Sequence, residues 1–290
     1  MNTTELIAAL KLHGSFPTSD DLFSDEDFLS LFNHQMKVEI TPLLLGLNEE
    51  YFLQSKNYDI SSGSLYRIPT RAIGSNVRTL FTIDSSGNKA SLSRLFEEDR
   101  PLNASGYYVV RNSIELSSDF NTGTLEMVYF ARPSTLVLTT ACAQVNGIDT
   151  VAKTVDVSSA PDTFITGIKL DFVQNNNPYD QLGMDYPLAG ISGTTLNFSN
   201  LPDGLEIGDW VCLATESPVP MISDELHPVL LQSALCKTLS SKKDKQFKDE
   251  KETFDQIKMN AINLLDPRVK DNSAKMRTGA LLGHFQSRRY

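Results

Sequence analysis

Three successive patterns of apolar and polar positions run along the chain. Over residues 1–56, apolar side chains recur at three- and four-residue spacing, which predicts helices that bury one face. Over 57–222 the spacing shortens to alternation, with Gly and Pro at short intervals, which predicts strands. From 223 the helical spacing returns. The order therefore predicts an α+β protein in which helices from both ends of the chain flank a β-rich insertion.

Capping residues and helix breakers predict where the N-terminal helices begin and end. Thr3 or Thr4 is expected to cap the first helix, and Gly14 to stop it. Ser24, followed by three acidic residues, is expected to begin the second, because negative charge is favourable at a helix N-terminus. Pro42 is expected to break that run, with a further short helix after it.

The β-rich segment carries a hairpin signal and two of the three cysteines. The alternating run 77–83 precedes a Ser-Gly-Asn turn, which predicts a β-hairpin. The whole segment is expected to be mostly antiparallel, either a sandwich or a set of small sheets. Cys142 and Cys212 lie in strand-like runs and Cys236 in the following helix, without metal-ligand spacing. We therefore expect buried thiols in a reducing compartment.

A pair of antiparallel helices is predicted over 223–266. The first helix carries one apolar stripe, and the second repeats large apolar residues at about seven-residue spacing, so the second should pack back on the first. The positions that carry these patterns are Leu226, Val229, Leu230, Leu235, Leu239, Phe247, Phe254 and Ile257. The Asp266-Pro267 step is expected to end the second helix.

Charge is distributed unevenly, and residues 267–290 form a basic C-terminal arm. From residue 237 to the end the chain has 13 Lys and Arg against 7 Asp and Glu, a net charge of +6. The net charge of the whole chain is −10, so residues 1–236 carry −16. Cations and apolar side chains together suit docking on a protein better than a solvated tail. The candidate anchors of the arm are Arg268, Lys275, Arg277, Leu281, Leu282, Phe285, Arg288, Arg289 and Tyr290.

Candidate chemistry is sparse, so the sequence predicts neither an enzyme nor a cofactor. It contains no phosphate-binding glycine loop, no zinc-protease motif and no hydrolase serine motif. Asp224 and His227 would share a helix face and offer two metal ligands, but no third is nearby. Ser223 as a cap, with acidic residues in the first turn, explains the same cluster as a helix start. We therefore expect no metal site.

Two other groups of polar residues have competing interpretations. Asp180 and Asp185 lie in an Asn-rich stretch without the acidic spacing of a calcium-binding loop, which favours a solvated loop. Arg67 and Arg71 flank a predicted turn, where a surface or subunit contact is favoured over an anion pocket.

The N-terminus has no basic segment followed by an apolar run, and no stretch approaches the roughly 20 apolar residues of a membrane span. The expectation is a protein made in the cytoplasm, with no contact with a membrane.

Several phrases resemble the neck proteins of tailed bacteriophages, and most closely the head-to-tail adaptor or connector family. They are YRIPTRAIGSNVRTLFTIDSSGNKASLSRL, GTLEMVYFARPSTLVL, LPDGLEIGDWVCLATESPVPMISDELHPVLLQSALCKTL and DPRVKDNSAKM. The resemblance covers residues 58–290 and consists of element order and short phrases rather than a catalytic motif. The long β insertion and the helices of 1–56 depart from the smallest adaptors, which leaves the role of 1–56 open.

The resemblance implies a structural virion protein of the neck, assembled in the host cytoplasm. Members carry a β domain inserted in a helical bundle and form a ring, usually a dodecamer, that continues the DNA channel. The implied partners are other copies of the chain, the portal protein, and a tail or nozzle protein. The implied ring-forming helices are 226–239 and 247–264, and the implied portal-binding arm is 268–290. DNA would pass without sequence-specific binding, since an acidic surface does not hold phosphates.

Two alternatives stay open. The chain could be another neck or tail component, such as a tail-completion or tail-tube protein. A carbohydrate-binding β domain is the alternative from another class, and its only local candidates are Tyr179, Asp180, Asp185 and Tyr186.

Overall fold

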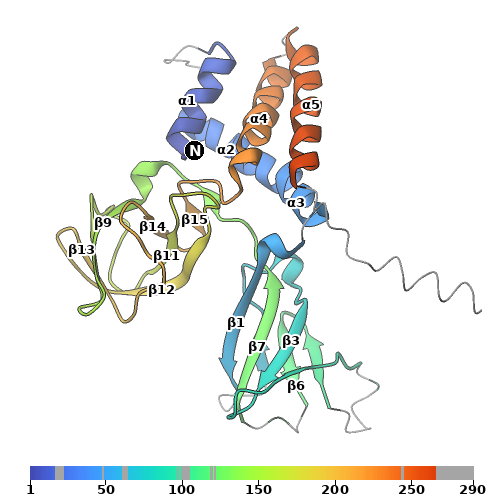
Figure 1. Ribbon diagram of the computed structural model, residues 1–290, viewed down its shortest axis with the longest axis vertical. Helices are drawn as coiled ribbons and strands as arrows, with labels where there is room; N and C mark the ends of the chain where they lie inside the picture. The colour runs from blue at the N-terminus through green and yellow to red at the C-terminus, as the bar shows by residue number, and fades with distance from the viewer. Residues whose placement is uncertain are drawn as a thin grey trace, which may run out of the picture.

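Helices from both ends of the chain share one hydrophobic core. The computed structural model describes residues 1–16, 23–47, 49–60, 65–96, 98, 105–117, 120, 122–242 and 245–265. Leu6, Phe28 and Phe32 from the N-terminal part pack with Leu230 and Leu235 from the C-terminal part, all of them buried. In Figure 1 these helices lie together at the top. They are α1 (Thr3–His13), α2 (Asp25–Gln35), α3 (Thr41–Leu47), α4 (His227–Lys242) and α5 (Phe247–Leu265).

The first two helices begin with reciprocal side-chain caps. The Ser24 side chain accepts a hydrogen bond from the Asp27 amide, and Asp27 accepts one from the Ser24 amide, which confirms the predicted start of α2. The same pair of bonds joins Asn2 and Glu5 at the start of α1. The cap of α1 is therefore Asn2, and the prediction of Thr3 or Thr4 was wrong. Gly14 is the C-cap of α1, as predicted.

Pro42 does not break the helical run, contrary to the prediction. A π-helical turn, η1 (Met36–Ile40), joins α2 to α3. A proline ring normally clashes with the carbonyl four residues earlier, and a π turn widens the backbone at this point. The Thr41 amide donates to the Met36 carbonyl five residues earlier, and the Thr41 hydroxyl donates to the same oxygen at 2.6 Å. The wider turn thus accommodates the proline within a continuous helical segment.

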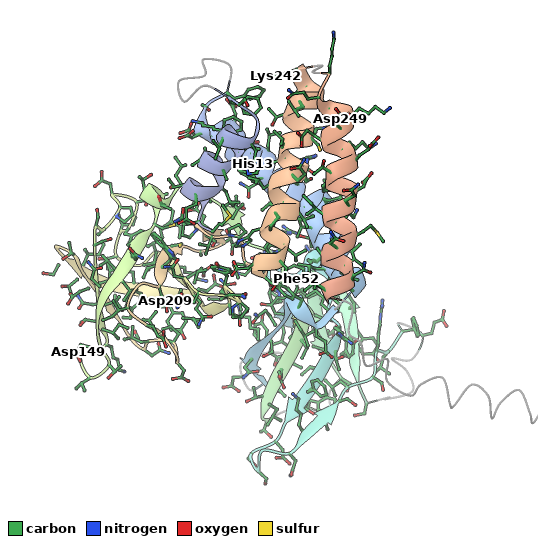
Figure 2. The ribbon with its side chains drawn as sticks, turned by 45° about the horizontal axis from the view of Figure 1, so that its top comes forward. His13, Phe52, Asp149, Asp209, Lys242 and Asp249 are labelled. Atoms are coloured by element: carbon green, nitrogen blue, oxygen red, sulfur yellow. The ribbon has the colours of Figure 1, made fainter. Side chains whose placement is uncertain are left out.

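The first strand, β1 (Leu53–Asp59), begins earlier in the chain than the sequence pattern indicated. After the 3-10 turn η2 (Glu49–Phe52), the chain is already extended at Leu53, although helix was expected to residue 56. Leu53 pairs with Phe130 in the first sheet, so long-range pairing decides this boundary. Phe52, labelled in Figure 2, lies where the helical core meets the sheets.

The first β unit consists of a four-stranded and a three-stranded antiparallel sheet that share a core. Alternate residues of β7, including Leu125, Met127 and Tyr129, are buried in this core. The predicted hairpin is confirmed: β3 pairs with β4 across a turn in which Asp84 accepts from two backbone amides, and Gly87 takes a positive φ of 82°. The sheet orders are β1-β7-β3-β4 and β2-β6-β5. The strands are β1 (Leu53–Asp59), β2 (Leu65–Arg67), β3 (Thr79–Ile83), β4 (Lys89–Ser91), β5 (Tyr107–Val110), β6 (Ser113–Leu116) and β7 (Thr124–Phe130).

The second β unit is a closed six-stranded barrel, seen on the left of Figure 1. Its strand order is β10-β13-β12-β11-β14-β9, and Phe172, Leu196 and Val211 fill the interior. Cys142, Cys212 and Cys236 are all buried and free, as predicted. Burial and the adjacent Cys142 raise the pKa of the Cys212 thiol. The strands are β9 (Ala143–Asp149), β10 (Thr154–Val157), β11 (Lys169–Val173), β12 (Gln181–Ser192), β13 (Thr195–Phe198) and β14 (Trp210–Leu213).

A short parallel pair links the barrel to the helices. β8 (Thr135–Leu136) lies beside β15 (Glu216–Ser217), and Asn33 of α2 exchanges hydrogen bonds with the backbone of Leu136 at 2.7 and 2.9 Å. The 3-10 turn η7 (Asp224–Leu226) then leads into α4. The α+β class is therefore shown. The first β unit is a pair of small sheets, which was one of the two expected arrangements, whereas the closed barrel of the second unit was not expected. Within the described residues, no helix has the length and apolar character needed to cross a membrane.

Candidate functional site

The nine candidate anchors of the C-terminal arm lie outside the described residues. They are Arg268, Lys275, Arg277, Leu281, Leu282, Phe285, Arg288, Arg289 and Tyr290. Their role stays a prediction.

The residues that marked the predicted helix pair contribute to the core of a single chain. Leu226, Val229, Leu230, Leu235 and Leu239 are buried, and Phe247, Phe254 and Ile257 of α5 pack partly buried against them. Figure 2 places Lys242 of α4 and Asp249 of α5 at the same end of the pair, so the two helices run antiparallel as predicted. Whether they also form a ring stays a prediction.

The outer side of α5 exposes two large apolar residues. Leu264 follows Ile257 by seven residues, so the spacing predicted that it would pack on α4, but it is 67% exposed and that prediction was wrong. Met259, which belongs to no predicted stripe, is 55% exposed.

The Asp224–His227 cluster joins the barrel to the start of α4. The Tyr179 hydroxyl, from the loop before β12, donates to Asp224 Oδ1 at 2.9 Å, and His227 Nδ1 lies 3.5 Å from the same oxygen. Burial lowers the pKa of His227 to about 4, although Asp224 partly opposes this shift. Burial, and then the bond to Asp224, raise the pKa of Tyr179 to about 12. Both side chains are thus neutral at pH 7.

The cluster forms the start of α4, as the capping interpretation predicted. No group of three potential His, Cys, Asp or Glu ligands gathers anywhere in the part of the chain that the structure describes. Ser223 precedes η7, as expected for a cap, but its side chain makes no capping hydrogen bond, so that detail of the prediction was wrong. The turn is 3-10, and acidic residues still occupy its first positions.

The four candidates for a carbohydrate site are not brought into one cleft. Tyr179 and Asp180 line a small cavity of about 40 Å³. Asp185 faces a different and larger cleft, and Tyr186 packs edge-on against Phe172 in the barrel interior.

Arg71 joins the two β units through a buried ion pair. It lies in the segment between β2 and β3 and is only 6% exposed. Its guanidinium donates to both oxygens of Asp171 in β11 at 2.7 and 2.8 Å, and to Asp185 at 3.1 Å. Burial acts to lower the pKa of Arg71, but the two carboxylates outweigh it and raise the pKa. The bidentate geometry fixes the distance and orientation of the guanidinium relative to the Asp171 carboxylate, and so joins the segment after β2 to β11.

Asp171 is the centre of this arrangement, although no sequence pattern identified it. The carboxylate is fully buried and also accepts from the Gln181 side chain at 2.8 Å, the Asp185 amide at 2.9 Å and the Thr215 amide at 2.8 Å. The available signal is that the aspartate of the strand KLDFV stands between apolar residues, Leu170 and Phe172, because a buried carboxylate needs partners.

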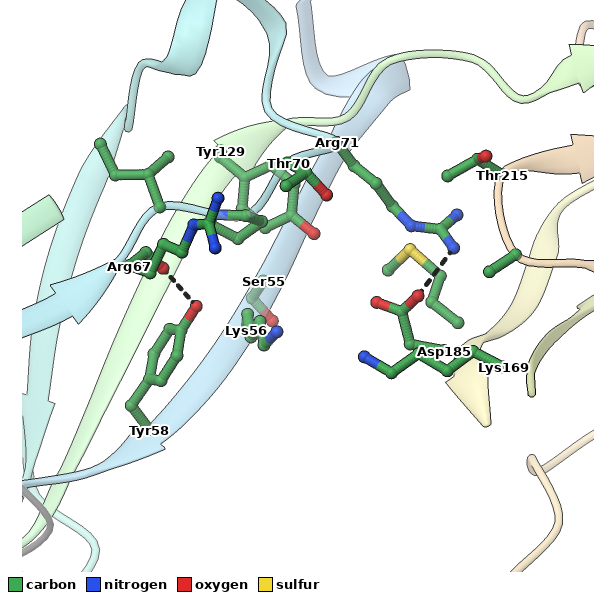
Figure 3. A pocket seen from close by; sticks show the side chains of 14 residues that line it. Ser55, Lys56, Tyr58, Arg67, Thr70, Arg71, Tyr129, Lys169, Asp185 and Thr215 are labelled. Atoms are coloured by element: carbon green, nitrogen blue, oxygen red, sulfur yellow. Dashed lines mark hydrogen bonds and ion pairs between the residues drawn. The ribbon is translucent and has the colours of Figure 1, made fainter. Parts of the chain in front are cut away.

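A basic cleft of about 760 Å³ opens beside this ion pair (Figure 3). Lys56 and Arg67 line it from the first β unit and Lys169 from the barrel. The Tyr58 hydroxyl on the same wall donates to the Arg67 carbonyl at 2.6 Å. Arg67 is exposed, in keeping with a surface position. Arg71 is buried and paired within the chain, so the prediction of a surface or subunit contact was wrong for Arg71. The cleft holds hydrogen-bond donors and positive charge but, among the described residues, no histidine or cysteine.

No protein-family model and no curated protein matches the chain.

Proposed function

We propose that this protein is a structural component of a virion neck, a head-to-tail adaptor without catalytic activity. Copies would form a ring between portal and tail that continues the DNA channel, and the C-terminal arm would dock on the portal. The observation that supports this proposal is the helical core built from both chain ends, from which the chain departs at 53 and to which it returns at 222. A β domain inserted in a helical bundle is the architecture that the resemblance implies, although the resemblance itself covers only residues 58–290.

The finer architecture in this proposal is a helical bundle that carries a mostly antiparallel β insertion and an extended tail. Contacts of α4 with α1, α2 and α5 support the bundle. The strand pairs within the described sheets of both β units are antiparallel, and β8–β15 is a parallel pair between them. The β units would then face neighbouring copies or tail components.

Charge supports the same proposal. The 236 residues before Lys237 carry a net charge of −16. An acidic wall repels phosphates and would let DNA slide through a ring, whereas clustered Lys and Arg would hold it.

The experiment is to mix the purified chain with its cognate portal ring and to measure the mass of the products by native mass spectrometry. A complex with one adaptor ring per portal ring is expected, and removal of residues 268–290 should abolish it without changing the thermal unfolding temperature. A full-length chain that forms no complex with the portal would overturn the proposal. Capture that survives the deletion would reassign the chain to a lower neck position, such as tail completion.

A further inference from the structure

A second groove, of about 930 Å³, lies between α2 and the barrel. Its apolar surface comes from Leu29 of α2, Leu138 of the segment before β9, and Ala160 and Leu213 of the barrel. Side chains from three distant parts of the sequence thus form one concave surface. We call it the acidic groove because of its charged residues.

The charged side chains that line the groove are all carboxylates. Glu26 and Asp162 are exposed at its edge, and Glu216 of β15 is partly buried within it. The described lining includes no Lys, Arg or His. A ligand that combined positive charge with apolar side chains would match both properties of this surface.

Glu216 places a partly buried carboxylate in the acidic groove. Burial raises the pKa of its carboxyl. Partial burial weakens the hydration of a carboxylate, so a Lys or Arg placed beside Glu216 would be favourable.

One segment of this chain has the complementary composition. Residues 267–290 contain six Lys and Arg against one Asp, together with Leu281, Leu282, Phe285 and Tyr290. We propose that the acidic groove binds this C-terminal arm of the same chain and that the arm leaves the groove when the portal competes for it. The release of the arm rests on the proposed function, because it needs the portal as competitor. The binding of the arm in the groove does not depend on that function.

The arm is long enough to reach the groove within one chain. Lys258 of α5 forms an ion pair with Glu39 of η1, which ties the two elements together. Glu39 is six residues from Asn33, which lines the groove, and Lys258 is seven residues from the end of α5. At the rise of a helix, each of these two stretches is about 10 Å long. The 24 residues of the arm span up to about 80 Å when extended.

Because the arm belongs to the same chain, a low affinity of the groove for the arm is enough to keep it bound. A tethered segment reaches an effective concentration on the order of millimolar, so modest complementarity suffices to hold it. Docking would cover the apolar anchors of the arm before assembly. A portal that binds the arm more tightly would then shift the population to the released form.

The test uses a fluorescent peptide of residues 267–290 and measures its binding by anisotropy. The peptide should bind the chain that ends at residue 266, and bind the full-length chain about tenfold more weakly, because the attached arm occupies the groove. Glu216→Lys in the shortened chain should weaken binding by about tenfold. Glu206→Lys, the same charge change on the barrel but outside the groove, should leave binding unchanged.

Asp162→Lys is the second variant, because Asp162 is exposed and its substitution should leave the fold intact. It should also weaken binding. No binding to the shortened chain, or equal binding by the Glu206 variant and both groove variants, would overturn the proposal.

A donor and acceptor dye on the arm and on α2 of the full-length chain should give energy transfer that is unchanged by dilution. Loss of transfer on dilution would show that a second copy supplies the arm and would overturn binding within one chain.

These assays contain no portal, so they separate the two proposals. Peptide binding with no portal capture would overturn the adaptor function and support the binding of the arm in the acidic groove. Portal capture with no peptide binding would support the adaptor function and overturn the binding of the arm in the groove.

Discussion

The Asp171 carboxylate is the most heavily hydrogen-bonded side chain described between the two β units. Besides those from Arg71, it accepts hydrogen bonds from the backbone amides of Asp185 and Thr215. Both residues have a positive φ, 60° for Asp185 and 76° for Thr215. Such a conformation is unfavourable for a β-branched residue like Thr215 and persists only where the surroundings hold it. Asp171 therefore stabilises two strained positions of the barrel and the contact to the neighbouring unit.

Replacing Arg71 with Ala should cost about 3–5 kcal/mol of unfolding free energy, because it leaves the buried Asp171 charge without its cation. Urea unfolding followed by tryptophan fluorescence measures this, since the single Trp210 lies in the barrel. Arg67→Ala is the matched control on the same cleft. Arg67 is exposed, and its loss should stay within about 0.5 kcal/mol. Equal losses in the two variants would contradict this role of Arg71.

His227 should make stability depend on pH. Its folded pKa of about 4 lies below the ordinary value of 6.5, so the unfolded chain takes up a proton first as pH falls. This contribution to stability is present above pH 6.5 and is lost between pH 6.5 and 4, by up to about 3 kcal/mol. His227→Gln should remove this part of the slope in thermal unfolding across that range. A slope that is unchanged in the His227 variant would refute the assignment.

At the scale of elements, the π turn at 36–40 shows how a helix tolerates a proline. Thr41→Val removes the buried hydroxyl bond to the Met36 carbonyl while keeping the side-chain shape, and should cost about 1 kcal/mol. Thr253→Val removes the same type of bond on the exposed face of α5, to the Asp249 carbonyl at 3.0 Å, and should have little effect. Chemical denaturation of both variants compares them directly. A larger loss at Thr253 than at Thr41 would count against this explanation.

Elements fixed by local chemistry could be predicted, and those fixed by distant pairing could not. Ser24 and the β3–β4 hairpin carry their signals within a few residues, and both were predicted correctly. Barrel closure needs β9 to pair with both β10 and β14, the latter about 65 residues away, and alternation of apolar residues is the same in a sandwich. The Arg71–Asp171 pair spans 100 positions, so the residues around Arg71 carried no signal of its buried partner, and the predicted surface or subunit contact was wrong.

At the scale of the whole molecule, the N-terminal helices depend on the C-terminal ones. α1 and α2 have 11 residues each, a length at which isolated helices are marginal in water. Their buried faces contact α4, which enters the sequence only after the barrel is complete. The order of elements therefore couples the two ends of the chain through one core, while each β unit has a core of its own.

Ending the chain at residue 222 should consequently unfold α1 and α2 while both β units persist. The expected result is a loss of backbone amide protection over residues 3–35 in hydrogen exchange, with protection retained at Phe172 and Met127. The control ends at residue 266 and keeps α4 and α5, so the protection of α1 and α2 should match that of the full-length chain. Protected helices in the shorter chain would show that α1 and α2 fold without α4. Loss of protection in the barrel as well would show that the helical core and the β units unfold together.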